Sequence, residues 1–205
     1  RSPHAVADGI MLADDRPVVQ VEDMTVSLDG LTRQRLIETW EGGRSAPAGP
    51  VFDRDQVLAF AQGRPSDAFG APYAPFDQDR FIARLPRPPY SFIDRVIEVE
   101  NAEAFQLAAG AKAQAEYDPP AESWYFENNH GVMPLAVLLE IALQPCGWLA
   151  AFLGSALASD QDLHFRNLGG TAVQHRTVEA GGGPLTTDVH LTRVSQSGGM
   201  IIQNF

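Results

Sequence analysis

Alternating apolar and polar positions near the start of the chain predict a β-hairpin. Residues 9–28 hold two runs rich in β-branched side chains, separated by the polar turn Ala13–Arg16. Helical spacing of apolar residues then predicts a helix over 31–40, which two consecutive glycines end. The stretch 42–50 is rich in Gly, Pro, Ser and Ala and has no periodicity, so we expect a linker there.

A second region begins after this linker. Asp53 precedes a helical pattern over 56–62, and a loop punctuated by Pro and Gly is expected over 65–76. Apolar, β-branched runs within 91–99 and 105–115 predict two strands that pair with each other.

A long apolar stretch follows, with Pro134 placed to open a helix of roughly 20 residues, or about 30 Å. Because this helix is apolar almost all round, we expect other elements to wrap it. Strand-like runs separated by Gly-rich turns come next, at 163–165, 171–178, 185–194 and 200–205.

This order of elements predicts an α+β fold in which an antiparallel sheet wraps one long central helix. We divide the chain into a leading segment, 1–41, a linker, 42–50, and a main domain, 51–205. A chain of 205 residues with 44% hydrophobic content can bury such a core.

The charge of the chain excludes one class of partner. With a formal net charge of -11 and a pI of about 4.7, the protein lacks the clustered cations that bind nucleic-acid phosphates. An acidic protein partner would also be repelled, so its docking would require a local basic patch such as Arg84, Arg87 and Arg95.

Cysteine usage and apolar runs bear on the compartment. The single cysteine, Cys146, cannot form an internal disulfide, and no basic segment followed by an apolar one opens the chain, so we expect a cytoplasmic protein. The run 132–158 is long enough to cross a bilayer, but Glu140, Gln144 and Pro145 interrupt it. We therefore interpret it as a core helix and expect no membrane partner.

Glu140 is the first candidate for chemistry because it is a carboxylate about two turns into an apolar helix. Burial would raise its pKa and make it a general acid at neutral pH. It could equally face solvent or bond Gln144 one turn on. The neighbouring residues alone favour neither interpretation.

His130 precedes the helix, whose free first-turn amides can polarise a carbonyl oxygen. A neutral imidazole there could abstract a proton, although a loop histidine bonded only to Asn128 or Asn129 explains the sequence as well. His164, His175 and His190 have no metal-ligand spacing. We expect neither a metal nor another cofactor.

Two segments resemble a known family. PPYSFIDRVIEVE (Pro88–Glu100) and WYFENNHGVMPLAVLLEIALQPCGWLAAFLGSAL (Trp124–Leu157) resemble parts of hot-dog 3-hydroxyacyl-[acyl-carrier-protein] dehydratases. Within the second, LLEIALQPCGWLAAFLG, together with FDRDQVLAFAQGRPSDAFG (Phe52–Gly70), is similar to the dehydratase region of polyunsaturated fatty acid synthases. The resemblance covers most of 52–205 and implies a hot-dog fold, as part of a double hot dog.

The resemblance implies that His130 is the base and Glu140 the acid, the latter contributed across a hot-dog dimer or pseudo-dimer. It implies dehydration of 3-hydroxyacyl chains that an acyl carrier protein presents on phosphopantetheine, with no further cofactor. Substrate contacts are expected from Gly131, Met133, Pro134, Leu135 and Gln144.

The chain departs from the family pattern at two positions. In the stand-alone enzymes the catalytic His stands eight residues before the Pro, where this chain has Phe126, whereas His130 stands four before Pro134. Leu135 replaces the usual small residue after that Pro. A hot dog that has lost its base and serves as a structural or acyl-binding partner is therefore the alternative to catalysis, and thioester hydrolysis ranks third.

The leading segment is similar to the last two strands of a hot-dog domain. The end of the chain, GGMIIQNF, resembles the start of such a hairpin without its final strand. We therefore expect a piece of a larger synthase, whose partner is another hot-dog module or a second copy.

Overall fold

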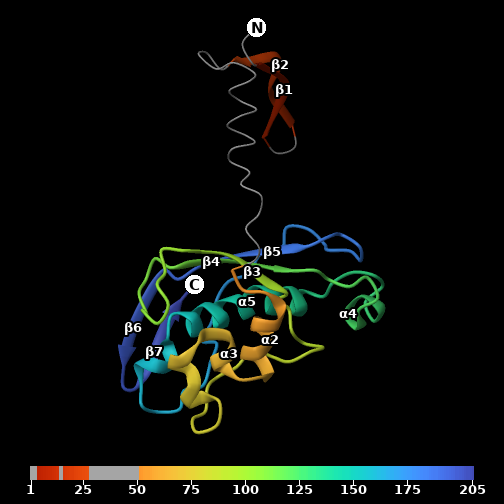
Figure 1. Cartoon of the computed structure of the whole chain (residues 1–205). Helices are drawn as coiled ribbons and strands as arrows, with labels where there is room; N and C mark the ends of the chain where they lie inside the picture. The colour runs from red at the N-terminus through yellow and green to blue at the C-terminus, as the bar shows by residue number, and fades with distance from the viewer. Residues whose placement is uncertain (1–3, 14–15, 28–50) are drawn as a thin grey trace. The chain divides into compact units, whose positions relative to one another are not determined.

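The computed structural model describes residues 4–13, 16–27 and 51–205 and divides the chain into two units, Arg1–Ala48 and Gly49–Phe205 (Figure 1). Each unit is described by itself. The helix expected over 31–40 and the linker over 42–50 lie outside the described residues.

The first unit contains an antiparallel hairpin. Strand β1 (His4–Ala13) pairs with strand β2 (Arg16–Ser27), and the register shifts by a residue at two places. The hairpin predicted over 9–28 is confirmed, and its pairing extends back to His4.

The second unit begins with helix α2 (Arg54–Gln62), and a reciprocal cap sets its start. The Asp53 carboxylate accepts a hydrogen bond from the Gln56 amide, and the Gln56 side chain accepts one from the Asp53 amide, both at 3.0 Å. Val57, Phe60 and Ala61 form its buried face. The predicted helix is confirmed.

The segment expected as a loop over 65–76 is instead two short helices, so that prediction is wrong. Helix α3 (Pro65–Phe69) begins with a proline, whose fixed φ suits a first helical turn, and the 3-10 helix η1 (Ala71–Phe76) follows. Tyr73 and Phe76 are buried there, so tertiary packing outweighs the Pro- and Gly-rich composition.

This unit contains a three-stranded antiparallel sheet in the order β3-β4-β5, and a hairpin of β6 and β7 follows its last strand along the chain. The predicted pairing within 91–115 is confirmed. Residues 163–165 and 171–178 were predicted as strands, but neither range forms one. Leu163 makes only an isolated bridge with Ile82. The bounds are β3 (Arg95–Glu100), β4 (Lys112–Tyr117), β5 (Leu185–His190), β6 (Arg193–Ser197) and β7 (Met200–Asn204).

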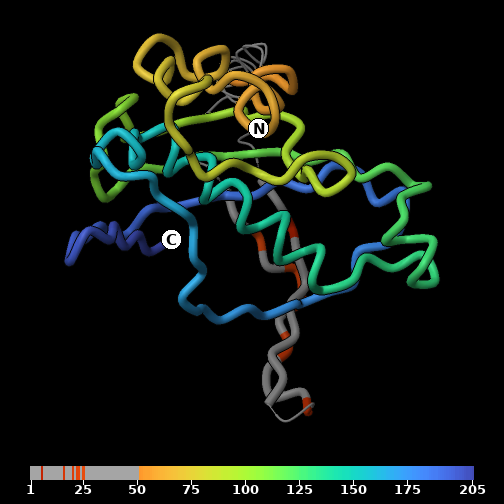
Figure 2. Tube along the Cα trace, turned by 90° about the horizontal axis from the view of Figure 1, so that it is seen from below, coloured from red at the N-terminus to blue at the C-terminus, as the bar shows by residue number. Residues whose placement is uncertain are grey.

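Helix α5 (Leu135–Phe152) packs across one face of this sheet, against β4 and β5 (Figures 1 and 2). The short helices α4 (Trp124–Glu127) and η2 (Ser155–Ala158) lie before and after it in the chain. The unit therefore combines antiparallel sheets with a helix packed against them, which is compatible with a hot-dog fold. In the described part of the chain the wrapping expected around the helix is incomplete.

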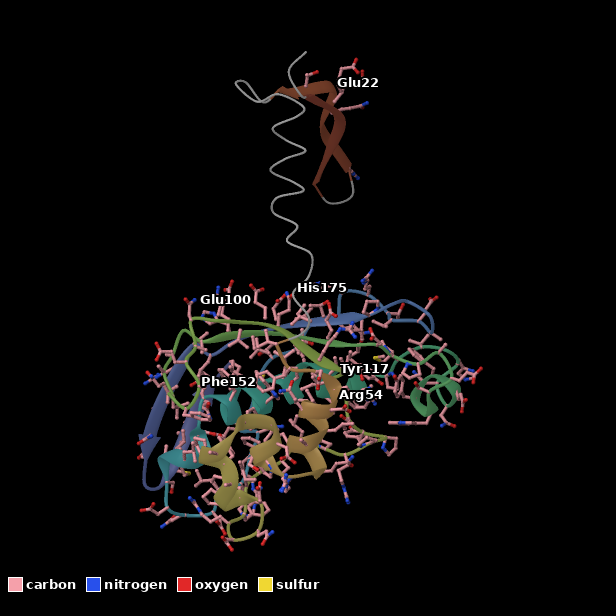
Figure 3. All side chains as sticks on the ribbon, in the orientation of Figure 1. Glu22, Arg54, Glu100, Tyr117, Phe152 and His175 are labelled. Carbon is pink, nitrogen blue, oxygen red and sulfur yellow. The ribbon has the colours of Figure 1, made fainter. Side chains whose placement is uncertain are left out.

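Two clusters of buried side chains hold helix α5 in place. The larger one surrounds the C-terminal half of the helix and includes Trp148, whose ring meets that of Phe52 edge-on at 5.0 Å. The smaller one adjoins the N-terminal half and includes Tyr117. Figure 3 labels Tyr117 near one end of the helix and Phe152 at the other.

Candidate functional site

A short, internally bonded loop positions His130. The amide of Gly131 donates to the carbonyl of Phe126 at 2.9 Å, and the amide of Val132 donates to the carbonyl of Asn129 at 3.0 Å. His130 itself is exposed and has a φ of +52°, a left-handed conformation that non-glycine residues adopt rarely. The loop is therefore fixed by its backbone, and the imidazole is open to solvent.

The backbone of Gly131 is fully committed within the chain. The Gly131 amide already has an acceptor, and the Gly131 carbonyl accepts a hydrogen bond from the amide of Ala180 at 3.0 Å. Met133 is buried in the smaller cluster, and its amide donates to the carbonyl of Val178 at 2.8 Å. These bonds tie the loop to the segment before β5. In this conformation the Gly131 amide cannot also polarise a ligand carbonyl.

The start of helix α5 retains free donors. Pro134 is the N-cap with an extended backbone, rather than the first helical residue expected from the sequence. The amides of Leu135 and Ala136 open the helix, where no intrahelical acceptor exists for them. The side chain of Leu135 is 47% exposed. Any amide contribution from this region therefore falls to the first turn of the helix.

Glu140 lies half-buried on helix α5, and its carboxylate contacts a polar group of its own helix. The Gln144 amide nitrogen lies 3.4 Å from a Glu140 carboxylate oxygen, one turn on. Of the two interpretations left open by the sequence, a Glu140–Gln144 contact is the one that forms. The carboxylate remains partly accessible, beside the exposed side chains of Leu139 and Leu143.

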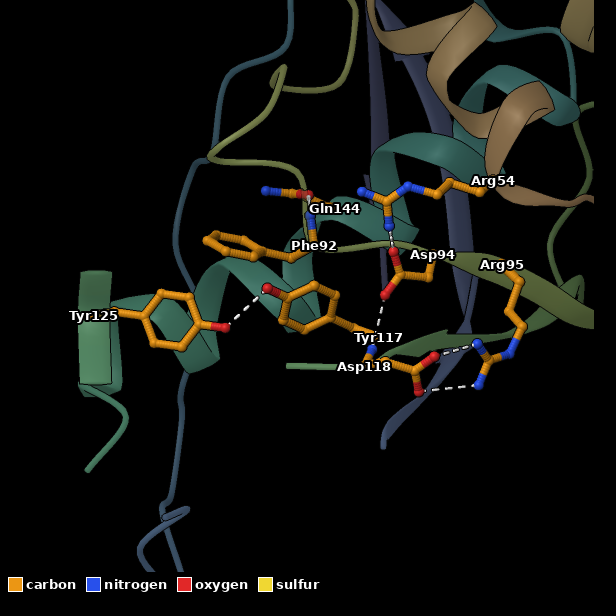
Figure 4. Close-up of polar contacts among 8 residues, drawn as sticks. All are labelled: Arg54, Phe92, Asp94, Arg95, Tyr117, Asp118, Tyr125 and Gln144. Carbon is orange, nitrogen blue, oxygen red and sulfur yellow. Dashed lines mark hydrogen bonds and ion pairs between the residues drawn. The ribbon is translucent and has the colours of Figure 1, made fainter. Parts of the chain in front are cut away.

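Gln144 is buried and joins helix α5 to the segment before strand β3 (Figure 4). Its side-chain oxygen accepts from the Phe92 amide at 2.8 Å, and its side-chain nitrogen donates to the Tyr90 carbonyl at 3.0 Å. These two hydrogen bonds to the backbone hold the Gln144 side-chain amide in place. The side-chain nitrogen that lies near the Glu140 carboxylate is therefore held in place as well. Sequence reasoning identified the residue but not this role.

A network of charged residues anchors the same segment to the sheet (Figure 4). Asp94 is buried, forms an ion pair with Arg54 and accepts from the Asp118 amide at 2.8 Å. Arg95 donates to the carboxylates of Asp118 and Glu116, and its bond to Asp118 lowers the pKa of that carboxyl. Asp94 and Arg95, within the segment Pro88–Glu100 that resembles the dehydratase family, therefore make structural contacts here.

This network changes the expected basic patch. The guanidinium of Arg95 is occupied by two carboxylates, and that of Arg84 donates to the carbonyls of Phe60 and Gly63. Of the three arginines considered for docking, Arg87 alone has no such partner in the described part of the chain.

A pair of buried tyrosines lies in the smaller cluster, and no pattern in the sequence signals it. The hydroxyls of Tyr117 and Tyr125 are 2.8 Å apart (Figure 4), and burial raises the pKa of Tyr117. Phe126, at the position of the family's histidine, is only 2% exposed in the same cluster. An aromatic core has thus formed at that position.

Within the described residues, no hydrogen bond or ion pair joins His130 to Glu140, and no group of three or more His, Cys, Asp or Glu side chains could hold a metal ion. Helix α5 is long and apolar enough to cross a membrane by length and composition alone, while close to half of it is buried inside the unit.

Comparison with known proteins finds a similarity to part of a lipid synthase. No family model matches the chain. The chain is 29% identical over 125 residues to a polyunsaturated fatty acid synthase subunit of Thraustochytrium sp. (strain ATCC 26185 / S-3). The match covers 57% of this chain but 8% of that protein, so the chain is similar to a small part of a much longer polypeptide.

Proposed function

We propose that the chain is a dehydratase module of fatty acid or polyketide synthesis, which converts 3-hydroxyacyl thioesters to 2-enoyl thioesters. One observation carries the proposal: Glu140 is a partly accessible carboxyl group among exposed leucines, and a buried glutamine fixes the amide that faces it. The similarity to a polyunsaturated fatty acid synthase subunit supports the substrate class.

In the proposed reaction, His130 removes the proton from the α-carbon of the thioester. The electrons of that C–H bond form the new double bond, the C–O bond at the β-carbon breaks, and Glu140 in its protonated form gives its proton to the leaving hydroxyl. One water molecule is lost and no oxidant or reductant is required. The free amides of Leu135 and Ala136 would stabilise the enolate oxygen.

The proposal includes a second hot-dog module. Since no hydrogen bond or ion pair joins His130 to Glu140 in the described part of the chain, the acid opposite His130 would come from a partner module, as the family resemblance implies. An acyl carrier protein would present the substrate between the two modules. The exposed leucines of helix α5 would then form one wall of the space between them.

The test is turnover of a 3-hydroxyacyl pantetheine thioester by the purified chain. His130→Ala and Glu140→Gln should each lower the rate by about a hundredfold or more while the circular dichroism spectrum stays unchanged. His175→Ala, at another exposed histidine, is the matched control and should retain full activity. Unchanged turnover by either site variant would remove that residue from the mechanism.

A non-catalytic hot dog is the second candidate, and the burial of Phe126 favours it. A buried aromatic ring at the position of the family's histidine cannot accept a proton. This alternative predicts that the isolated chain has no turnover and still binds an acyl carrier protein. Turnover that depends on His130 would exclude it.

A further inference from the structure

A row of exposed leucines runs along helix α5 beside Glu140. Leu135, Leu139 and Leu143 are 47%, 37% and 41% exposed. Their spacing of four residues places them on one face of the helix, and Glu140 borders that face because it is three residues from Leu143. The proposed acid thus lies at the edge of an apolar strip.

This strip continues toward the C-terminal end of the helix. Gly147 is the next position at the same spacing, and a Cβ atom there would lie 3.5 Å from the side chains of both Leu85 and Phe165. Leu85 and Phe165 therefore cover Gly147 at van der Waals distance, and the apolar strip leads from the leucines up to Phe165.

Phe165 is also part of the wall of a cavity of about 350 Å³ at this end of the helix. This volume is within the range of small-molecule pockets, roughly 300–1,000 Å³. Its lining is divided between apolar side chains, among them Ile82, Ala151, Leu163 and Ile201, and polar or charged ones, among them Gln161, Asp162, His164 and Arg166. The apolar part offers a surface that a hydrocarbon chain can contact.

The spacing along the helix sets the length of such a ligand. Glu140 and Ala151 are eleven positions apart, which is roughly 17 Å at a rise of 1.5 Å per residue. An extended acyl chain advances about 1.3 Å per carbon, so roughly 13 carbons span this distance. A short acyl chain bound at Glu140 cannot reach the cavity, whereas a long one can enter it.

We infer that the cavity receives the distal part of a long acyl chain and so selects long-chain substrates. The inference rests on the proposed function, in which the hydroxyl and thioester ends of the chain lie at Glu140. The apolar strip carries the middle of the chain, and the cavity receives its end. Each methylene removed from water should strengthen binding about fourfold, so even partial filling produces strong selectivity.

Gln203 separates this inference from its main alternative. It lines the cavity, and its side-chain oxygen is buried without a hydrogen-bond partner in the described part of the chain. A hydrocarbon chain cannot donate a hydrogen bond to this oxygen, so Gln203→Leu should strengthen binding of a long chain. If the cavity instead received the pantetheine arm, whose amides can donate to Gln203, the same substitution would weaken binding.

The experiment is calorimetric titration of the full chain with 3-hydroxybutanoyl and 3-hydroxyhexadecanoyl pantetheine thioesters. The chain carries Glu140→Gln to prevent turnover. We expect the hexadecanoyl ligand to bind at least about tenfold more tightly. Ala83→Trp places a large side chain in the cavity, so it should abolish this preference and leave binding of the butanoyl ligand unchanged. Met200→Trp, at a more exposed position of the cavity wall, should have the same effect. Val173→Trp, 70% exposed and outside the cavity, is the control.

Equal affinities for the two ligands, or weaker binding of the hexadecanoyl ligand to Gln203→Leu, would overturn the inference. Those results would leave dehydration itself untouched, since turnover by the unmodified chain tests it separately. Conversely, selective binding of the long chain without turnover by the unmodified chain would retain the inference for an acyl-binding module and remove the catalytic proposal.

Discussion

The two halves of helix α5 are both largely apolar but lie in different surroundings. In the C-terminal half, every residue from Trp148 to Ala151 is buried, and Trp148, Leu149 and Ala151 share a cluster with the helices that precede the sheet. In the N-terminal half, buried Val137 and Ile141 alternate with exposed leucines. The C-terminal half is sequestered by its own chain, and the N-terminal half presents an apolar surface.

This difference separates a structural half from a candidate functional half. A large apolar side chain that is fully exposed to water forgoes about 1.5–3 kcal/mol of stabilisation, and these leucines, which are 37–47% exposed, forgo part of it. A row of three such side chains marks a candidate interaction surface. Glu140 lies beside that row, and the residue that contacts it, Gln144, stands where the two halves meet. The arrangement favours chemistry at the open half.

The largest expected effect is on the free energy of unfolding in the structural half. Trp148→Ala removes a ring that packs against Phe52 and Phe152 and should lower this free energy by about 3–5 kcal/mol. Leu143→Ala, in the exposed row, should lower it by less than about 1 kcal/mol. Urea unfolding of both variants measures the contrast. Similar losses would mean that Leu143 is covered in the folded protein.

A smaller effect is expected at the junction of the two halves. Gln144→Leu leaves the Phe92 amide without its acceptor inside the protein, which should cost about 1–3 kcal/mol of unfolding free energy. The matched control is Gln114→Leu, since Gln114 bonds Asp188 on the exposed face of the sheet and should cost a few tenths of a kcal/mol. Equal losses in urea unfolding would show that the buried bonds of Gln144 contribute no more than an exposed one.

Local signals were enough to predict the elements that local interactions determine. The cap of helix α2 lies within four residues, and the strands of the hairpin are separated by a short turn, so both could be recognised in the sequence. Glu140 could also be singled out, because a carboxylate in an apolar helix is conspicuous.

Non-local contacts set the remainder. Gln144 bonds a backbone amide 52 positions earlier in the chain, and no local pattern signals such a contact. The helical turns within 65–76 depend on the burial of Tyr73 and Phe76 against distant elements. A helix that is apolar all round gives no sign of which face remains open, so the exposed row of leucines could not be predicted either.

The smallest expected effect concerns Cys146, next to the junction. Burial raises the pKa of its thiol to about 11 from its ordinary value of 9.0. The folded protein therefore holds the neutral thiol at pH values where the unfolded chain has begun to ionise, and stability should fall as the pH rises from about 9 to 11. At pH 8, alkylation by iodoacetamide should be roughly ten to a hundred times slower than in urea-unfolded protein and should accelerate as the pH approaches 11. Equal rates for folded and unfolded protein at pH 8 would place Cys146 on the open surface, with the leucines, rather than in the structural half of the helix.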